Sequence, residues 1–281
     1  PVEIEGENIM TKPGRFCALS KAAQKTAEIT LDNTFNLSDG QDSVGEILKA
    51  DASVLNRDVK IISGKVVTKG EISVSILYTP ENSLEPTFAE NVVPFTEIID
   101  VEGIDEDNIN SVRFEIVKND VIPSVGDQSR RSIDCHMRIA VYIDSDELIC
   151  ADVISDAYST KCNLDVKTTS VSVMELISNI QTSISVKESI KIPDKIPQIS
   201  KIYHLISKPY IEKCEPVKNK LRIAGVLDTY VLYISAKEDS PVYSFKAEIP
   251  FKADIDCDKS TDGCEISLFA ETSRFSYSIN A

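Results

Sequence analysis

Seven cysteines are the residues best able to do chemistry in this 281-residue chain. Thiols form disulfides, bind metals or act as nucleophiles, depending on their spacing and surroundings. If the cysteines oxidise within one chain, an odd count leaves at least one over, which indicates a free thiol or a bond between chains. A cytosolic environment would normally keep them reduced.

Five of the cysteines favour an exposed position. Four stand between polar neighbours and one lies in the N-terminal segment: Cys17, Cys162, Cys214, Cys257 and Cys264. We expect these thiols to form disulfides between subunits once conditions become oxidising. Free surface thiols without a role are the first alternative. Zinc is a weaker one, because Cys257 and Cys264 lack closely spaced partners and both histidines, His136 and His204, are isolated.

Cys135 and Cys150 lie outside this set. Cys135 shares an alternating apolar face with Ile133 and Met137, which predicts a buried, inert thiol. The acidic run at 144–147 predicts the turn of a hairpin over residues 131–156. In that hairpin the two cysteines would lie about 20 Å apart along the ladder, too far to form a disulfide.

An acidic segment near the C-terminus resembles a calcium loop. Its carboxylates fall at positions 1, 3, 5, 9 and 12 of an EF-hand-like loop: Asp254, Asp256, Asp258, Asp262 and Glu265. Position 6, where such loops need glycine, is Lys259. A solvated acidic loop is therefore the favoured interpretation, and calcium is the alternative.

Signatures of catalysis are missing from the sequence. There is no phosphate-binding glycine loop, no zinc-protease helix motif and no nucleophile elbow. We therefore expect no enzyme, no cofactor and no catalytic residue. A hydrolase that uses two of the many carboxylates stays open as an alternative, although no spacing singles out a pair.

The sequence that contains these cysteines and carboxylates has an internal repeat. The repeated features are Gly70 and Gly225, Tyr78 and Tyr233, Pro94-Phe95 and Pro250-Phe251, and Asp100 and Asp256. The offset is 155 residues at the glycine and 156 at the proline, and it continues upstream from Ile29 onto Ile184. When the two copies are aligned, no cysteine of one copy falls on a cysteine of the other. We therefore expect that the fold does not depend on an internal disulfide.

Alternating apolar residues predict strands in both copies. We expect mainly β structure: an N-terminal arm or short helix over 1–27, then tandem antiparallel sandwich- or barrel-like domains over 28–170 and 171–281. Short helical turns are expected at 44–48 and 199–205. The prolines Pro94 and Pro250 predict sheet edges or bulges, since proline cannot donate to a ladder.

The second copy lacks a counterpart of the hairpin expected over 131–156. An open sheet edge there would need a cover, which a neighbouring subunit is able to supply. We state this as an expectation about the second domain.

The composition of the chain excludes several classes of binding partner. The formal charge of −15 argues against nucleic acid and against anionic lipid. No apolar run is long enough to span a bilayer. Tryptophan is absent, which makes a platform for stacking carbohydrate less favoured. We expect the chain to bind copies of itself and other proteins, with a glycan- or cation-binding surface module as a further alternative.

The run from Gly70 through Tyr78, Pro94-Phe95 and Asp100 to Asp156-Ala157-Tyr158-Ser159 resembles the SPOCS-domain family of clostridial endospore envelope proteins. The resemblance covers most of the first copy and part of the second. It implies two SPOCS-type β domains and a place at the spore surface, in the exosporium or outer coat, reached from the mother-cell cytoplasm.

Two roles are implied by this resemblance. One is a cysteine-rich protein that self-assembles into a two-dimensional lattice held by disulfides. The other is a coat morphogenetic adaptor that recruits another coat protein. The adaptors carry a LysM module, of which this sequence shows no sign, and the cysteine content exceeds what an adaptor needs. We therefore expect the lattice.

Overall fold

Antiparallel strands make up all the regular secondary structure that the described residues contain. The computed structural model describes residues 8–167, 169–170, 172–173, 175–236, 242–258, 260–261, 263–274 and 276–279. Their strands are β1 (Ile9–Asn36), β2 (Val44–Ile62), β3 (Lys65–Pro80), β4 (Thr87–Asp100), β5 (Ile109–Pro123), β6 (Ser132–Ser159), β7 (Ile199–Val217), β8 (Lys220–Ser235) and β9 (Val242–Asp256). Within the same ranges no helix has the length and apolar character needed to cross a bilayer.

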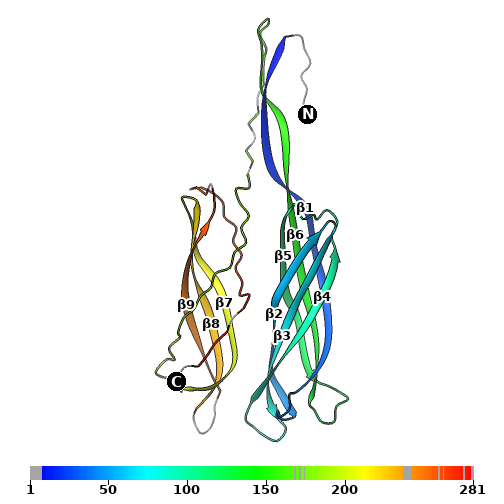
Figure 1. Ribbon diagram of the computed structural model, residues 1–281, viewed down its shortest axis with the longest axis vertical. Coiled ribbons are helices and arrows are strands. Elements are labelled where there is room, and N and C mark those ends of the chain that lie inside the picture. Colours follow the sequence, from blue (N-terminus) through cyan, green and yellow to red (C-terminus); the bar gives the residue numbers. More distant parts are fainter. Residues whose placement is uncertain are drawn as a thin grey trace.

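The strands form three sheets, with the orders β1-β6-β5, β2-β3-β4 and β7-β8-β9 (Figure 1). The first two sheets belong to the first copy of the repeat and share one hydrophobic core. Ile72, Val74 and Ile76 of β3 supply one side of that core, and Ile139 and Val141 of β6 supply the other. The first copy is therefore an open β-sandwich, not a closed barrel.

The repeated tyrosines, Tyr78 and Tyr233, make equivalent hydrogen bonds in the two copies. The Tyr78 hydroxyl donates to the Asp42 carbonyl at 3.0 Å, and the Tyr233 hydroxyl donates to the Pro197 carbonyl at 2.9 Å. Each tyrosine is completely buried, which makes a hydrogen-bond partner necessary. The sheets β2-β3-β4 and β7-β8-β9 are thus equivalent, as the repeat predicts.

The glycine of each copy makes room for the phenylalanine opposite it. Gly70 pairs with Phe95 across β3 and β4, and Gly225 pairs with Phe251 across β8 and β9. A Cβ on Gly70 would lie 2.8 Å from the Phe95 ring, closer than packed carbon atoms approach. The neighbouring Pro94 lies on β4, an edge strand of its sheet, as expected from its missing donor.

Several expected elements are wrong. Residues 44–48 and 199–205 begin strands β2 and β7 and are not helical turns. Of the arm or short helix expected over residues 1–27, the described part contains no helix and instead forms the first part of β1. The hairpin expected over 131–156 is one continuous 28-residue strand, β6.

The acidic run in β6 stays extended because both neighbouring strands neutralise it. Lys21 of β1 lies 2.8 Å from Asp146 and 3.6 Å from Asp144, and Arg113 of β5 lies 4.0 Å from Asp144. Ser145 between these aspartates is buried and accepts a hydrogen bond from Asn108. Cross-strand charge pairs of this kind stabilise a sheet where the local sequence alone suggests a turn.

Beyond Asp146, β6 continues as a two-stranded ribbon with β1. Residues Ile9–Lys21 pair with Asp146–Ser159 past the end of the sandwich. In Figure 1 this ribbon projects from the first copy, opposite the end at which β2 begins. The projecting arm is therefore a ribbon built from both ends of the first copy's sequence.

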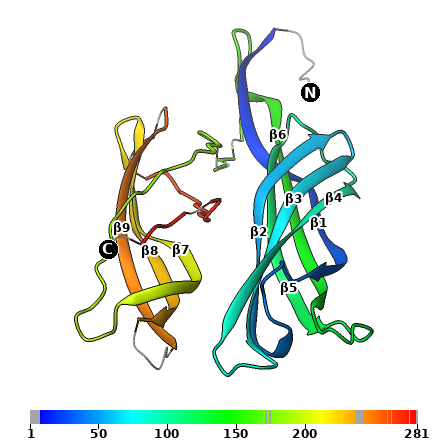
Figure 2. The same ribbon diagram turned by 60° about the horizontal axis from the view of Figure 1, so that its bottom comes forward.

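Strands β4 and β7 form one of the contacts between the two copies. The Phe88 and Tyr203 rings meet edge to face with centroids 6.1 Å apart, and Lys201 lies over Phe88. The Tyr203 hydroxyl donates to the Pro86 carbonyl. Burial in this contact raises the pKa of Tyr203 to about 12. Figure 2 shows the β7-β8-β9 sheet beside the first sandwich.

Candidate functional site

Cys17 and Cys150 form a disulfide within the chain. They are cross-strand partners in the β1–β6 ribbon, with Cα atoms 4.1 Å apart. Cys17 was expected to bond between chains, and the structure corrects this, because the register of β1 against β6 sets it directly opposite Cys150. The bond closes the ribbon across 133 residues of sequence.

The expectation that Cys135 and Cys150 do not pair is confirmed, for a different reason. Both lie on β6, 15 residues apart along one extended strand, which separates them by roughly 50 Å at the usual rise. Cys135 is completely buried in the sandwich core, as its alternation with Ile133 and Met137 predicts. Burial raises the pKa of the Cys135 thiol to about 11.

Cys257 is also buried, which corrects its expected exposure. It directly follows β9 and takes the place that Val101 holds after β4, and only 7% of Cys257 is exposed. Its N–H donates to the Asn219 carbonyl at 2.9 Å, as the N–H of Val101 donates to Gly64 at 2.8 Å. The polar neighbours of Cys257 in the sequence therefore do not reflect the direction of its side chain.

Three reduced cysteines remain accessible: Cys162, Cys214 and Cys264. Cys162 is exposed and follows the end of β6, where its thiol donates to the Ser159 hydroxyl at 3.4 Å. Cys162 lies outside any sheet, just beyond the far end of the projecting ribbon, where Ser159 pairs with Ile9. It is the most exposed of the three accessible cysteines.

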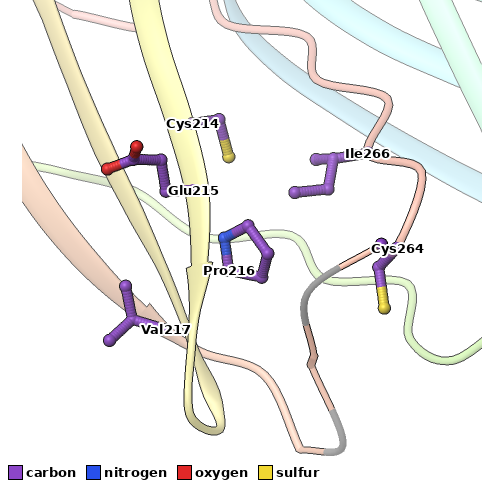
Figure 3. A pocket seen from close by; sticks show the side chains of 7 residues that line it. Cys214, Glu215, Pro216, Val217, Cys264 and Ile266 are labelled. Atoms are coloured by element: carbon purple, nitrogen blue, oxygen red, sulfur yellow. The ribbon is translucent and has the colours of Figure 1, made fainter.

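Cys214 and Cys264 line one open pocket beside β7 (Figure 3). Glu215, Pro216 and Ile266 also line it, and the two thiols come from opposite walls. Both cysteines are reduced and partly buried. Burial and the nearby Glu215 carboxylate raise the pKa of Cys214, which lowers its reactivity as a nucleophile. Cys214 and Cys264 are fifty residues apart in the sequence. No sequence pattern indicates that they share a pocket.

The acidic segment does not converge into a calcium loop in the described residues. Asp254 lies on β9 and accepts from Arg222 of β8 at 3.0 Å, which lowers the pKa of the Asp254 carboxyl. Asp256 lies 3.5 Å from Lys220. Position 9 of the loop, Asp262, lies outside the described residues, and Asp258 and Glu265 belong to no metal-holding cluster among those described. The first two carboxylates therefore neutralise cations of the neighbouring strand.

One family model matches the chain, described as SipL, SPOCS domain, over residues 43–122 and 198–280. The two matched regions cover more than half of the chain, and one lies within each copy of the repeat. The chain belongs to the SPOCS-domain family. Each matched region of this SPOCS protein begins just before the first strand of a three-stranded sheet, at β2 or β7. Searches of curated proteins and of solved structures found no match.

Membership in the SPOCS family makes this a spore-associated protein. The repeated tyrosine and glycine residues of the SPOCS family stabilise the sheets. The tyrosine is buried, and the glycine leaves room for a phenylalanine ring. The accessible groups that are able to react are instead the thiols, whose positions differ between the two copies.

Proposed function

We propose that this SPOCS protein is a structural, non-enzymatic component of the spore's outer envelope, in the exosporium or coat, where it assembles with copies of itself into a two-dimensional lattice. Disulfides between subunits then lock the lattice. The protein reaches the spore surface from the mother-cell cytoplasm, requires no cofactor, and has other envelope proteins as further partners. Nucleic acid and membranes are not among its partners.

The accessibility of the thiols supports this proposal best. The fold uses Cys17 and Cys150 in its own disulfide and buries Cys135 and Cys257. Cys162, Cys214 and Cys264 are left reduced and accessible, Cys162 after the end of β6 and the other two in one pocket beside β7. A protein that needed sulfur only for its own stability would have no use for three such thiols, whereas a lattice needs several linking points per subunit.

The geometry of a lattice follows from repeating one contact. A heterologous contact that is repeated closes into a ring or continues as an open array, depending on its rotation. The projecting ribbon and the second copy present different surfaces, which suits head-to-tail contact. The chain's net charge of −15 opposes non-specific clustering, so assembly depends on specific contacts.

Negative-stain microscopy of the purified protein tests the lattice directly. We expect rings, sheets or tubes at high protein concentration with reductant present, because geometry precedes covalent locking in this proposal. Monodisperse monomers under the same conditions would count against the lattice. They would favour the adaptor, which binds another coat protein without assembling itself.

A further inference from the structure

The three accessible thiols lie in two different kinds of place. Cys162 is exposed, and its thiol lies 3.4 Å from the hydroxyl of Ser159, which pairs with Ile9 at the far end of the projecting ribbon. Cys214 and Cys264 instead line the pocket beside β7, and both are only partly exposed. One thiol therefore protrudes from the molecule, and two are recessed in it.

The ribbon holds Cys162 away from the pocket of its own chain. Strand β6 follows the ribbon over Asp146–Ser159, a length of roughly 40 Å at the usual rise. The disulfide between Cys17 and Cys150 joins the two strands of the ribbon and keeps them paired. Figure 1 shows the ribbon extending past the end of the β7-β8-β9 sheet. This arrangement favours contact between Cys162 and the pocket of a neighbouring molecule.

The residues beside the thiols differ in charge. Cys162 directly follows Lys161, which is exposed. Glu215 lines the pocket, and the exposed Glu265 directly follows Cys264. Two Cys162 thiols that approach each other bring lysine toward lysine, and two pockets that face each other bring glutamate toward glutamate. Only the approach of Cys162 to the pocket brings opposite charges together.

We propose that the pocket beside β7 receives Cys162 of a second copy of the chain, and that a disulfide there joins Cys162 of one subunit to Cys264 of the next. This inference rests on the proposed self-assembly and names the thiols that lock it. Because the two surfaces differ, the contact is heterologous and repeats from subunit to subunit. Each subunit then takes part in two bonds, one through its ribbon and one through its pocket.

The surroundings of the two pocket thiols favour Cys264 over Cys214 as the bonding partner. The attacking species in disulfide formation is the thiolate. Burial raises the pKa of Cys214, and Glu215 raises this pKa further. The Thr261 hydroxyl lies 3.6 Å from the Cys264 sulfur, where it is able to donate to a thiolate. Cys264 also lies outside the strands, whereas Cys214 is held in the ladder opposite Ile223.

A small-molecule disulfide, oxidised glutathione, serves as the oxidant. The Cys162 thiolate attacks one sulfur of oxidised glutathione, which forms a mixed disulfide and releases one glutathione thiolate. The Cys264 thiolate of the next subunit then attacks the Cys162 sulfur, and the second glutathione thiolate leaves. In total two cysteine thiols lose two electrons and two protons, and one glutathione disulfide becomes two glutathione thiols.

Complementary variants of the full chain test the pairing. The ribbon variant, Cys214→Ser with Cys264→Ser, keeps Cys162, and the pocket variant, Cys162→Ser with Cys214→Ser, keeps Cys264. With oxidised glutathione, each variant alone should run as a monomer on a non-reducing gel, whereas their equimolar mixture should give a dimer and nothing larger. The matched control, Cys162→Ser with Cys264→Ser, keeps Cys214 and should give at least tenfold less dimer with the ribbon variant.

A charge exchange provides a second readout in the same mixture. Lys161→Glu in the ribbon variant should slow dimer formation at low salt about three- to tenfold, because it sets acid against acid. Glu265→Lys in the pocket variant should restore the rate. Glu265 is changed instead of Glu215, since Glu215 already lies 2.7 Å from Lys213. Glu102→Lys, on the exposed turn after β4, is the control of equal net charge and should not restore the rate.

Four results would overturn the pairing: a dimer of either variant alone, no dimer in their mixture, a parent chain that stays monomeric with Cys162 bonded to its own Cys264, or a rate that Glu102→Lys restores as well as Glu265→Lys does. The lattice is judged separately, by microscopy with reductant present. Assemblies in reductant without a mixed dimer would reject only the pairing, and a mixed dimer without such assemblies would reject only the lattice.

Discussion

At the scale of the residue, burial and not sequence neighbourhood decides what each cysteine does. Cys257 stands between two aspartates yet occupies a core position, whereas Cys162 stands outside the sheets with its thiol accessible. The equivalent position in the first copy, Val101, shows why Cys257 is buried: the turn after the edge strand directs this side chain inward in both copies. The reactivity of the thiols should follow the same order.

Thiol labelling tests this order. With N-ethylmaleimide at about pH 7.5 and the Cys17–Cys150 bond intact, we expect Cys162 to react first and Cys214 and Cys264 more slowly. Cys135 should react only after denaturation, because its pKa of about 11 keeps the thiol protonated and the core excludes the reagent. Peptide mass spectrometry over a time course measures the rates. Labelling of Cys135 as fast as Cys162 would contradict the packing described here.

At the scale of the element, the same sequence pattern has different outcomes in the two copies. Ile29 and Ile184 occupy equivalent places in an alternating apolar run. Ile29 lies in β1, paired with Ile139 of β6, whereas Ile184 has no ladder partner in the described structure. A strand therefore forms only where a neighbour is present, since its backbone groups need partners as much as its side chains need a core.

A matched pair of substitutions measures this asymmetry. Ile29→Ala should lower the free energy of unfolding by about 2–4 kcal/mol, because it removes buried methyl groups and leaves a cavity. Ile184→Ala should change it by less than about 0.5 kcal/mol. Urea denaturation followed by circular dichroism compares the two variants with the parent chain. Equal losses of stability would show that the second copy buries Ile184 in solution.

At the scale of the whole molecule, a complete sandwich with a projecting ribbon is joined to a second three-stranded sheet, β7-β8-β9, and the described residues include no other sheet packed on it. The Phe88 and Tyr203 rings form a contact between the two copies. The lattice that we propose would use the projecting ribbon as one contact surface and the second copy as another.

Crosslinking tests the proposed locking of the assembly. On non-reducing gels, protein treated with oxidised glutathione should give a ladder that collapses with reductant. Replacing Cys162, Cys214 and Cys264 together with Ser should abolish the ladder and leave assemblies visible by microscopy. Cys257→Val is the matched control, because valine occupies this place in the first copy, and it should keep the ladder. A ladder that survives the triple replacement would show that other cysteines are exchanged between chains.

The repeat, the β class, the burial of Cys135 and the edge position of Pro94 could all be predicted before the fold was known. All of these depend on alternation or on the donor that proline lacks, which are properties of short segments. Tertiary structure alone decided that Cys17 meets Cys150, that Asp144–Asp146 stays extended, and that Cys214 and Cys264 share a pocket. Each of these depends on the register between strands far apart in the chain, and no local pattern encodes that register. The same reason explains the second copy, where apolar alternation persists but the partner strand that would order it is not among the described residues.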